Sequence, residues 1–305
     1  MGVFWSALAG RLTERWLAAA APAAVFWGAV LAAWCAGHGG VDAARDLVRE
    51  VAERSAAAQV AGLLAILVGL LASGLLVSRL TQPLLRLMTG QWPAVLRPLA
   101  GPLVRRAGER LAARSARVTE LERRPYSTLT AAEQRELWRL GAWLDRQPVP
   151  VELTPTRLGN LMRSSASTVR SYYGLEPAVV WPHLWLLLPD RARTELGAAR
   201  ARMDAAAAGG LWALLALPAV AWTWWTLPVA LIVGGVSWGW LLPDATDVFC
   251  RLVPATFALY RADLYRTLRW PLPTDPGTEP AEGERLTAHL DRGEVNRPPL
   301  FTPDA

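Results

Sequence analysis

A stretch of 39 residues, from Ala205 to Pro243, contains no charged side chain. About 20 apolar residues of helix cross the hydrocarbon core of a bilayer, so this stretch is long enough for two membrane spans. Pro228, near its middle, lacks a backbone donor and disfavours helix at the residue before it. The adjacent Trp224 and Trp225 favour the membrane–water interface. The sequence therefore predicts a hairpin of two spans that reverses near Pro228 in an integral membrane protein.

Two further spans are predicted within residues 16–80. Trp16–Ala36 is 21 residues long without a charge, and Ala58–Ser78 is also free of charge, with Gln59 at its edge. The loop 38–57 between them holds three Arg and four acids, with apolar residues at helical spacing. We expect this loop to form a short amphipathic helix on the outer side of the membrane.

Charge sets the orientation of the predicted spans. All 32 basic residues are Arg, and Arg79–Asp204 holds 20 of them against 11 acids. Because Arg-rich loops stay on the cytoplasmic side, the N-terminus (1–15), the middle and the C-terminus are expected inside a plasma (inner) membrane. The predicted fold is all-α: a four-span helical membrane protein with a cytoplasmic Arg-rich helical domain, residues 81–204, inserted between spans 2 and 3.

Local signals divide the rest of the chain. Thr130 and Glu133 have capping-box spacing, and Thr154-Pro155 predicts the start of a helix that Gly174 ends. Residues 205–270 are expected to form the transmembrane hairpin of spans 3 and 4, continued by a long cytoplasmic helix. The tail, residues 271–305, has seven Pro and a net charge of −4. We expect it to be mostly disordered or draped on a surface, with one short helix at Ala281–Leu290.

Arg157, Asn160 and Arg163 are spaced to share one helical face. Two guanidinium groups beside an amide offer many donors and few acceptors, which suits an anion, a partner loop or backbone carbonyls. Asp263 is a candidate internal partner. The alternatives are a binding site for a partner or anion and a buried contact between domains. Two tryptophans of the following apolar helix, Trp181 and Trp185, belong to the same candidate contact.

Asp244 and Asp247 are the acids nearest to the apolar core of a predicted span. Ionisable groups at membrane depth mark ion paths, so they are candidates for conduction. The alternative is a structural role, since Asp247 can pair with Arg251 one helical turn later.

Small residues recur on two spans. Ala65, Gly69 and Ser73 fall every four residues, and Gly235 and Gly239 form G-x-x-x-G. Both patterns indicate close helix packing within the chain or in a homo-oligomer. Gly235–Gly239 also matches the G-x-S-x-G nucleophile motif, but that motif needs a strand before it. No catalytic residue is therefore predicted here.

The sequence contains no motif for a metal, nucleotide or nucleic-acid site. The three His show no metal-ligand spacing, and no phosphate-binding Gly loop is present. No metal, cofactor or nucleic acid is expected. Arg clusters such as Arg105-Arg106 fit a bilayer with anionic headgroups, together with a protein partner in the cytoplasm.

Three short runs carry a resemblance: Pro155-Thr156-Arg157-Leu158-Gly159-Asn160, Tyr173-Gly174-Leu175-Glu176 and Trp181-Pro182-His183-Leu184-Trp185. Their order resembles a group of uncharacterised bacterial multi-pass membrane proteins with a P-T-R-L-G-N … Y-G-L-D … W-P-x-L-W core. Departures are Ala166, where an acid is expected, and His183, where Arg is expected. The resemblance implies a membrane location and a shared cytoplasmic helical core, and brings no activity with it.

Two functions follow from these features. The first is a non-enzymatic membrane protein whose cytoplasmic helical domain is a scaffold, sensor or docking module for a partner. The alternative is an oligomeric channel or transporter with a path near Asp244 and Asp247. The first is favoured because the predicted spans contain few polar side chains to line a pore.

Overall fold

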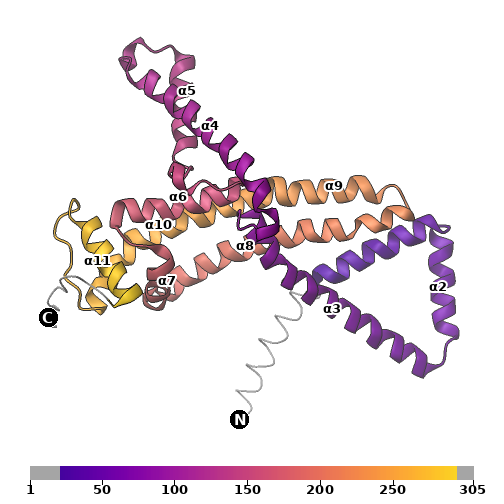
Figure 1. The fold of residues 1–305 in the computed structure, drawn as a ribbon. Helices are drawn as coiled ribbons and strands as arrows, with labels where there is room; N and C mark the ends of the chain where they lie inside the picture. The colour runs from indigo at the N-terminus through magenta and orange to yellow at the C-terminus, as the bar shows by residue number, and fades with distance from the viewer. Residues whose placement is uncertain (1–20, 294–305) are drawn as a thin grey trace. The chain divides into compact units, whose positions relative to one another are not determined.

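The computed structural model describes residues 21–293, and all regular elements in this range are helices (Figure 1). The predicted all-α class is confirmed for these residues, which contain no strand. The predicted N-terminus, residues 1–15, lies outside the described residues, as do the first five residues of the first predicted span and the last part of the tail.

The chain divides into two compact units. Unit 1 comprises residues 1–85 and 203–242, and unit 2 comprises residues 86–202 and 243–305. Each unit therefore gathers segments that are far apart in the sequence.

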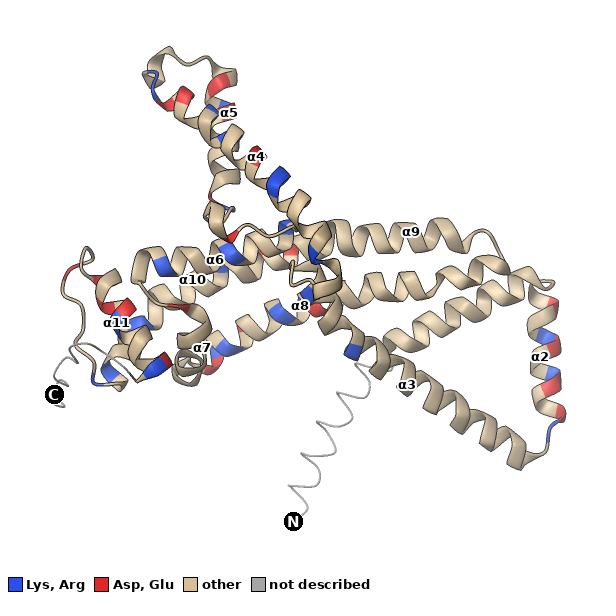
Figure 2. Ribbon diagram, viewed as in Figure 1, with Lys and Arg blue, Asp and Glu red and all other residues tan. Residues whose placement is uncertain are grey.

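Three helical stretches are long and apolar enough to cross a membrane: Ala56–Met88, Asp190–Ala221 and Thr226–Thr267. A fourth is reached only if the helix Ala21–Gly37 and α2 (Val41–Glu53), which are bent by 112°, count as one broken span. Figure 2 shows that α9 (Thr226–Val236) carries no charge, whereas α2 carries both signs. The chain is thus a helical protein with several apolar helices, as a multi-pass membrane protein has. The four-span count stays a prediction.

Unit 1 combines the apolar helices with short turns. Its remaining elements are α3 (Ala56–Met88) up to residue 85, α8 (Asp190–Leu215) from residue 203, the 3₁₀ helix η4 (Leu217–Ala221), α9 and the π-helical turn η5 (Ser237–Leu241).

α8 and α9 with its π-helical continuation run antiparallel, and two glycines of α8 allow their close approach. A Cβ on Gly210 would lie 1.9 Å from the Trp238 indole nitrogen, and one on Gly209 would lie 2.8 Å from the Ser237 hydroxyl. The Trp238 indole also donates to the Ala207 carbonyl at 3.1 Å. Only glycines leave room for this interdigitation.

The glycines proposed from sequence do not make such contacts. A Cβ on Gly235 or Gly239 would meet no atom within 4 Å, and the same holds for Gly69 on α3. Ala65 is exposed, whereas Ser73 accepts a hydrogen bond from the Trp27 indole at 3.1 Å. Of the predicted packing residues, Ser73 alone has a partner helix within the described chain. Gly235 therefore makes no close contact within the described chain, and its predicted role in helix packing stays a prediction.

Unit 2 is built around the long helix α10 (Leu242–Thr267), which continues α9 through the π turn. Its other elements are η1 (Ala94–Leu96), α4 (Arg97–Glu122), η2 (Tyr126–Thr128), α5 (Ala131–Leu144), η3 (Pro150–Glu152), α6 (Arg157–Tyr173), α7 (Pro177–Leu187) and α11 (Glu279–Arg292). Fully buried side chains from α6, α7, α10 and α11 share one core, among them Val169, Leu184, Phe257 and Leu286.

The tail helix α11 is docked on unit 2 and includes the short helix expected at Ala281–Leu290. α11 crosses the end of α6, where Gly174 has a φ of +67° and a Cβ would lie 1.7 Å from the Pro280 carbonyl oxygen. Glu279 accepts a hydrogen bond from the Arg261 guanidinium at 2.5 Å, and Leu286 is fully buried. Residues 294–305 lie outside the described residues.

Candidate functional site

The polar face predicted on α6 is divided by the structure into a buried amide and two exposed cations. Thr156 caps the helix by accepting from the Gly159 amide at 3.1 Å, so α6 begins two residues later than Thr154-Pro155 predicted. Thr154 is used differently, because its amide and its hydroxyl both donate to Asn160 Oδ1, at 2.7 and 2.8 Å. Asn160 is only 7% exposed and holds the turn that leads into α6.

Arg157 and Arg163 are exposed, and no ion pair or hydrogen bond joins either of them to the described part of the chain. Asp263, the proposed partner, accepts from Arg266 at 2.8 Å, three residues along its own helix. The proposed tie between this face and Asp263 is therefore not formed. Asn160 belongs to the fold, and the two arginines remain candidates for an external anion.

Replacing Asn160 tests this division of roles. Asn160→Ala removes the acceptor of two donors and is expected to cost about 1–3 kcal/mol of stability. Arg157→Ala, at an exposed position, is expected to change stability by about 0.5 kcal/mol or less. Thermal unfolding of the detergent-purified protein measures both. Equal losses of stability in the two variants would indicate that Arg157 also has a structural role.

Trp181 and Trp185 are half-buried parts of the unit 2 core. Their rings are 5.9 Å apart, and Trp181 lies 6.0 Å from Phe257 of α10. Aromatic pairs at this separation stabilise a core. These positions support α7 against α10 and offer little surface to a partner.

The two candidate ion-path acids have different surroundings. The Asp247 carboxylate contacts Arg251, as the spacing predicted, and also Arg146 at 3.5 Å. Asp244 is exposed. Asp247 therefore joins α10 to the segment after α5, which is the structural alternative.

The helices α4 and α5 form an antiparallel hairpin held by charge pairs. Arg117 bonds Glu136 at 3.1 Å, Arg124 bonds Glu133 at 2.6 Å, and the Arg114 guanidinium lies 4.1 Å above the Trp143 ring. We call this hairpin, residues 97–144, the arm.

Ionisation of the arm follows from these pairs. The pKa of Glu133 falls to about 2, because it accepts from the Thr130 backbone and hydroxyl in the predicted capping box and from Arg124. The hydrogen bond from Arg117 lowers the pKa of Glu136, and Glu136 and Glu120 together raise the pKa of Arg117. These groups are charged at neutral pH, so the ion pairs between α4 and α5 are present there.

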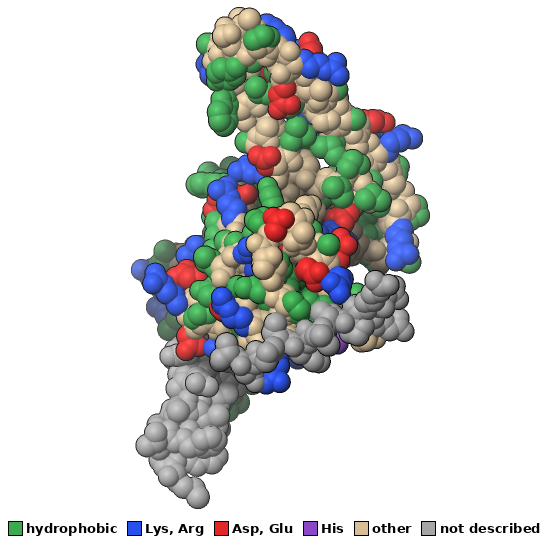
Figure 3. All heavy atoms as spheres, turned by 90° about the vertical axis from the view of Figure 1, so that its left-hand side faces the viewer, with side chains coloured by type: hydrophobic (Ala, Val, Ile, Leu, Met, Phe, Trp, Pro, Cys, Tyr) green, Lys and Arg blue, Asp and Glu red, His purple; other side chains and the backbone are tan. Residues whose placement is uncertain are grey.

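One stripe of α4 faces outward with both apolar and basic side chains. Leu99, Leu103, Arg106 and Arg110 are spaced by four, three and four residues, which places them on one face. Leu99 is 60% exposed and Leu103 37%, and both arginines are exposed without an ion pair inside residues 21–293. Hydrophobic and basic side chains intermix on the surface of unit 2 (Figure 3). We call these four residues the α4 stripe.

Sequence reasoning recognised the basic character of this region and missed its exposed aromatics. Trp138 on α5 is 73% exposed and Tyr126 in η2 is 57% exposed. Only the pairing of α4 with α5 shows that Trp143 is covered by Arg114 and Trp138 is not.

Comparisons with known protein families, with curated proteins and with solved structures give no match. The fold and the arm therefore define the class only as a helical protein with apolar helices of membrane-spanning length and a basic helical hairpin. No group of three or more His, Cys, Asp or Glu suited to a metal occurs within residues 21–293. The resemblance to multi-pass membrane proteins stays a prediction.

Proposed function

We propose that this chain is a non-enzymatic integral membrane protein whose arm is a docking module for a protein partner in the cytoplasm. The α4 stripe is the observation that carries the proposal. It is a continuous surface in which two exposed leucines adjoin two arginines that have no ion pair within the described chain.

The chemistry of the stripe selects the partner. Exposed apolar side chains contribute binding free energy when a partner covers them and removes them from water. Arginine binds carboxylates through two parallel hydrogen bonds. An amphipathic helix with an acidic edge satisfies both requirements. Trp138 and Tyr126, elsewhere on the arm, are residue types that often anchor interfaces.

The location is part of the same proposal. The Arg-rich segments that flank the apolar helices in sequence fall on one side of a four-span arrangement, which supports a plasma (inner) membrane protein with both termini in the cytoplasm. Anionic headgroups are a second ligand for arginines that follow a membrane-spanning helix so closely. Small-residue faces such as Ala65–Gly69 support a homo-oligomer.

A photo-crosslinking amino acid at Leu103 tests the docking function in cells. We expect it to capture a protein, and Arg106→Glu to lower the capture by roughly tenfold, as a loss of about 1.4 kcal/mol would. Arg191→Glu, an exposed arginine on α8, is the matched control and should leave capture unchanged.

Two results would count against docking. One is crosslinking to lipid alone, and the other is equal capture by wild type and Arg106→Glu. A cysteine at Ser115 checks the topology in the same cells, because it should react with an impermeant reagent only after the membrane is opened.

The alternative, an oligomeric channel or transporter with a path near Asp244 and Asp247, has less support. Asp247 is engaged by two arginines, which leaves Asp244 as the exposed acid. Ion flux into liposomes that carry the purified protein, if lost in Asp244→Asn, would favour this alternative over docking.

A further inference from the structure

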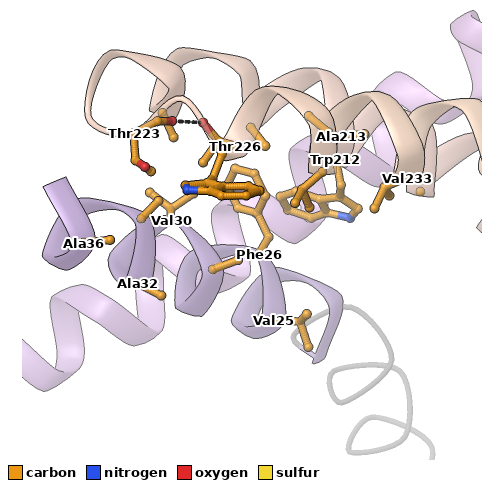
Figure 4. A pocket seen from close by; sticks show the side chains of 18 of the residues that line it. Val25, Phe26, Val30, Ala32, Ala36, Trp212, Ala213, Thr223, Thr226 and Val233 are labelled. Atoms are coloured by element: carbon orange, nitrogen blue, oxygen red, sulfur yellow. Dashed lines mark hydrogen bonds between the residues drawn. The ribbon is translucent and has the colours of Figure 1, made fainter. Parts of the chain in front are cut away.

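An apolar pocket of about 630 Å³ lies among the helices of unit 1 (Figure 4). It is partly open, since lining residues such as Val25 and Trp225 are more than 60% exposed. Its walls come from the helix Ala21–Gly37, the end of α8, η4 and α9. Small-molecule sites in proteins have volumes of roughly 300–1,000 Å³, so the pocket is large enough for a ligand.

The lining of the pocket is almost pure hydrocarbon. No charged side chain lines it, and its hydroxyls are those of Thr223 and Thr226. Alanines from two helices, such as Ala29 and Ala213, leave the space open. The rings of Phe26 and Trp212, whose centroids are 4.7 Å apart, close one side.

The two ends of the pocket differ. Figure 4 shows Thr223 and Thr226 together at one end and Val233 toward the other. The Thr226 hydroxyl donates to the Thr223 carbonyl at 2.7 Å. Trp224 and Trp225, both more than 60% exposed, lie in the same turn. Tryptophans favour the membrane–water interface, so the threonine end is the interfacial end.

An apolar space of this size does not stay empty in a bilayer. Water gains too few hydrogen bonds there, and smaller engineered apolar cavities stay dry and take up apolar molecules. The molecules that surround membrane-spanning helices are lipids, and their chains match the lining.

We propose that this pocket binds one hydrocarbon chain of a membrane lipid, with the polar part of the lipid beside Thr223 and Thr226. The chain runs from the interface toward Val233 and packs on Phe26 and Trp212. The site is independent of the arm and of the docking function, and it rests on the proposed location in a membrane.

The test uses the full chain in vesicles that contain a phospholipid with a photoactivatable diazirine in one acyl chain. We expect labelling concentrated on residues 21–37 and 209–233. Ala29→Phe places a ring inside the pocket and should lower this labelling about tenfold, the effect of about 1.4 kcal/mol. Leu64→Phe, at an exposed position of α3 outside the small-residue stripe, is the control and should label as wild type does.

Ala36→Phe is a second variant that fills the interfacial end, in case Ala29→Phe fails to fold. Labelling spread evenly over α3 and the pocket residues would overturn the proposal, because this result is expected when lipid surrounds the protein without binding in the pocket. So would a wild-type pocket that does not label because residues 1–20 or a second copy of the chain occupy it.

Discussion

Gly210→Leu is expected to separate α8 from the π-helical turn that follows α9. A Cβ at position 210 would lie 1.9 Å from the Trp238 indole nitrogen, so the indole has to move. That movement breaks its hydrogen bond to the Ala207 carbonyl. Overpacking costs about 1–3 kcal/mol, and hydrogen bonds between membrane helices average about 0.6 kcal/mol. Thermal unfolding of the detergent-purified protein, followed by tryptophan fluorescence, measures the loss.

Gly235→Leu is the matched control. It adds the same side chain 25 residues along the hairpin, where a Cβ meets no atom within 4 Å. We expect Gly235→Leu to unfold like wild type in a monomeric preparation. Destabilisation by Gly235→Leu and not by Gly210→Leu would show that the G-x-x-x-G pair is the packing face after all.

The contrast between these glycines shows what sequence can predict about the apolar helices. Absence of charge over Ala205–Pro243 is a property of a single segment, so the apolar hairpin could be predicted. Which face of a helix is covered depends on its rotation relative to a neighbour. Gly209 and Gly210 form no spaced pattern, and their importance becomes visible only opposite Ser237 and Trp238.

The same distinction separates the correct and the wrong predictions about polar groups. The capping box is a local feature, because Glu133 follows Thr130 by three residues, and the structure confirms it. The proposed partner of Arg157 depended on two distant helices, and Asp263 instead bonds Arg266 within its own helix. Asp247 forms one ion pair of each kind. Its pair with Arg251 is local and follows from the spacing of four residues, whereas its pair with Arg146 joins distant segments and is visible only in the folded chain. Likewise, no single helix encodes the pocket in unit 1.

Gly283→Ala is expected to detach the tail helix α11 from unit 2. A Cβ at position 283 would lie 1.8 Å from the Tyr173 carbonyl oxygen, which is backbone and cannot rotate away. Opposite it, Gly174 approaches the Pro280 carbonyl as closely. The crossing therefore tolerates no side chain on either glycine. When α11 separates from unit 2, the buried side chain of Leu286 becomes exposed. Losing the packing of a buried leucine costs about 2–5 kcal/mol of stability, which is a large loss for one short helix.

Hydrogen exchange of residues 279–292 measures this detachment directly. Wild type should protect these amides, and Gly283→Ala should expose them, with trypsin then cutting after Arg285. Gly277→Ala is the matched control, because its Cβ would meet only the Asp275 carboxylate, at 3.4 Å or more. Unchanged protection in Gly283→Ala would mean that α11 is held without the close crossing. In that case the ion pair of Arg261 with Glu279 and the burial of Leu286 would suffice to hold the helix.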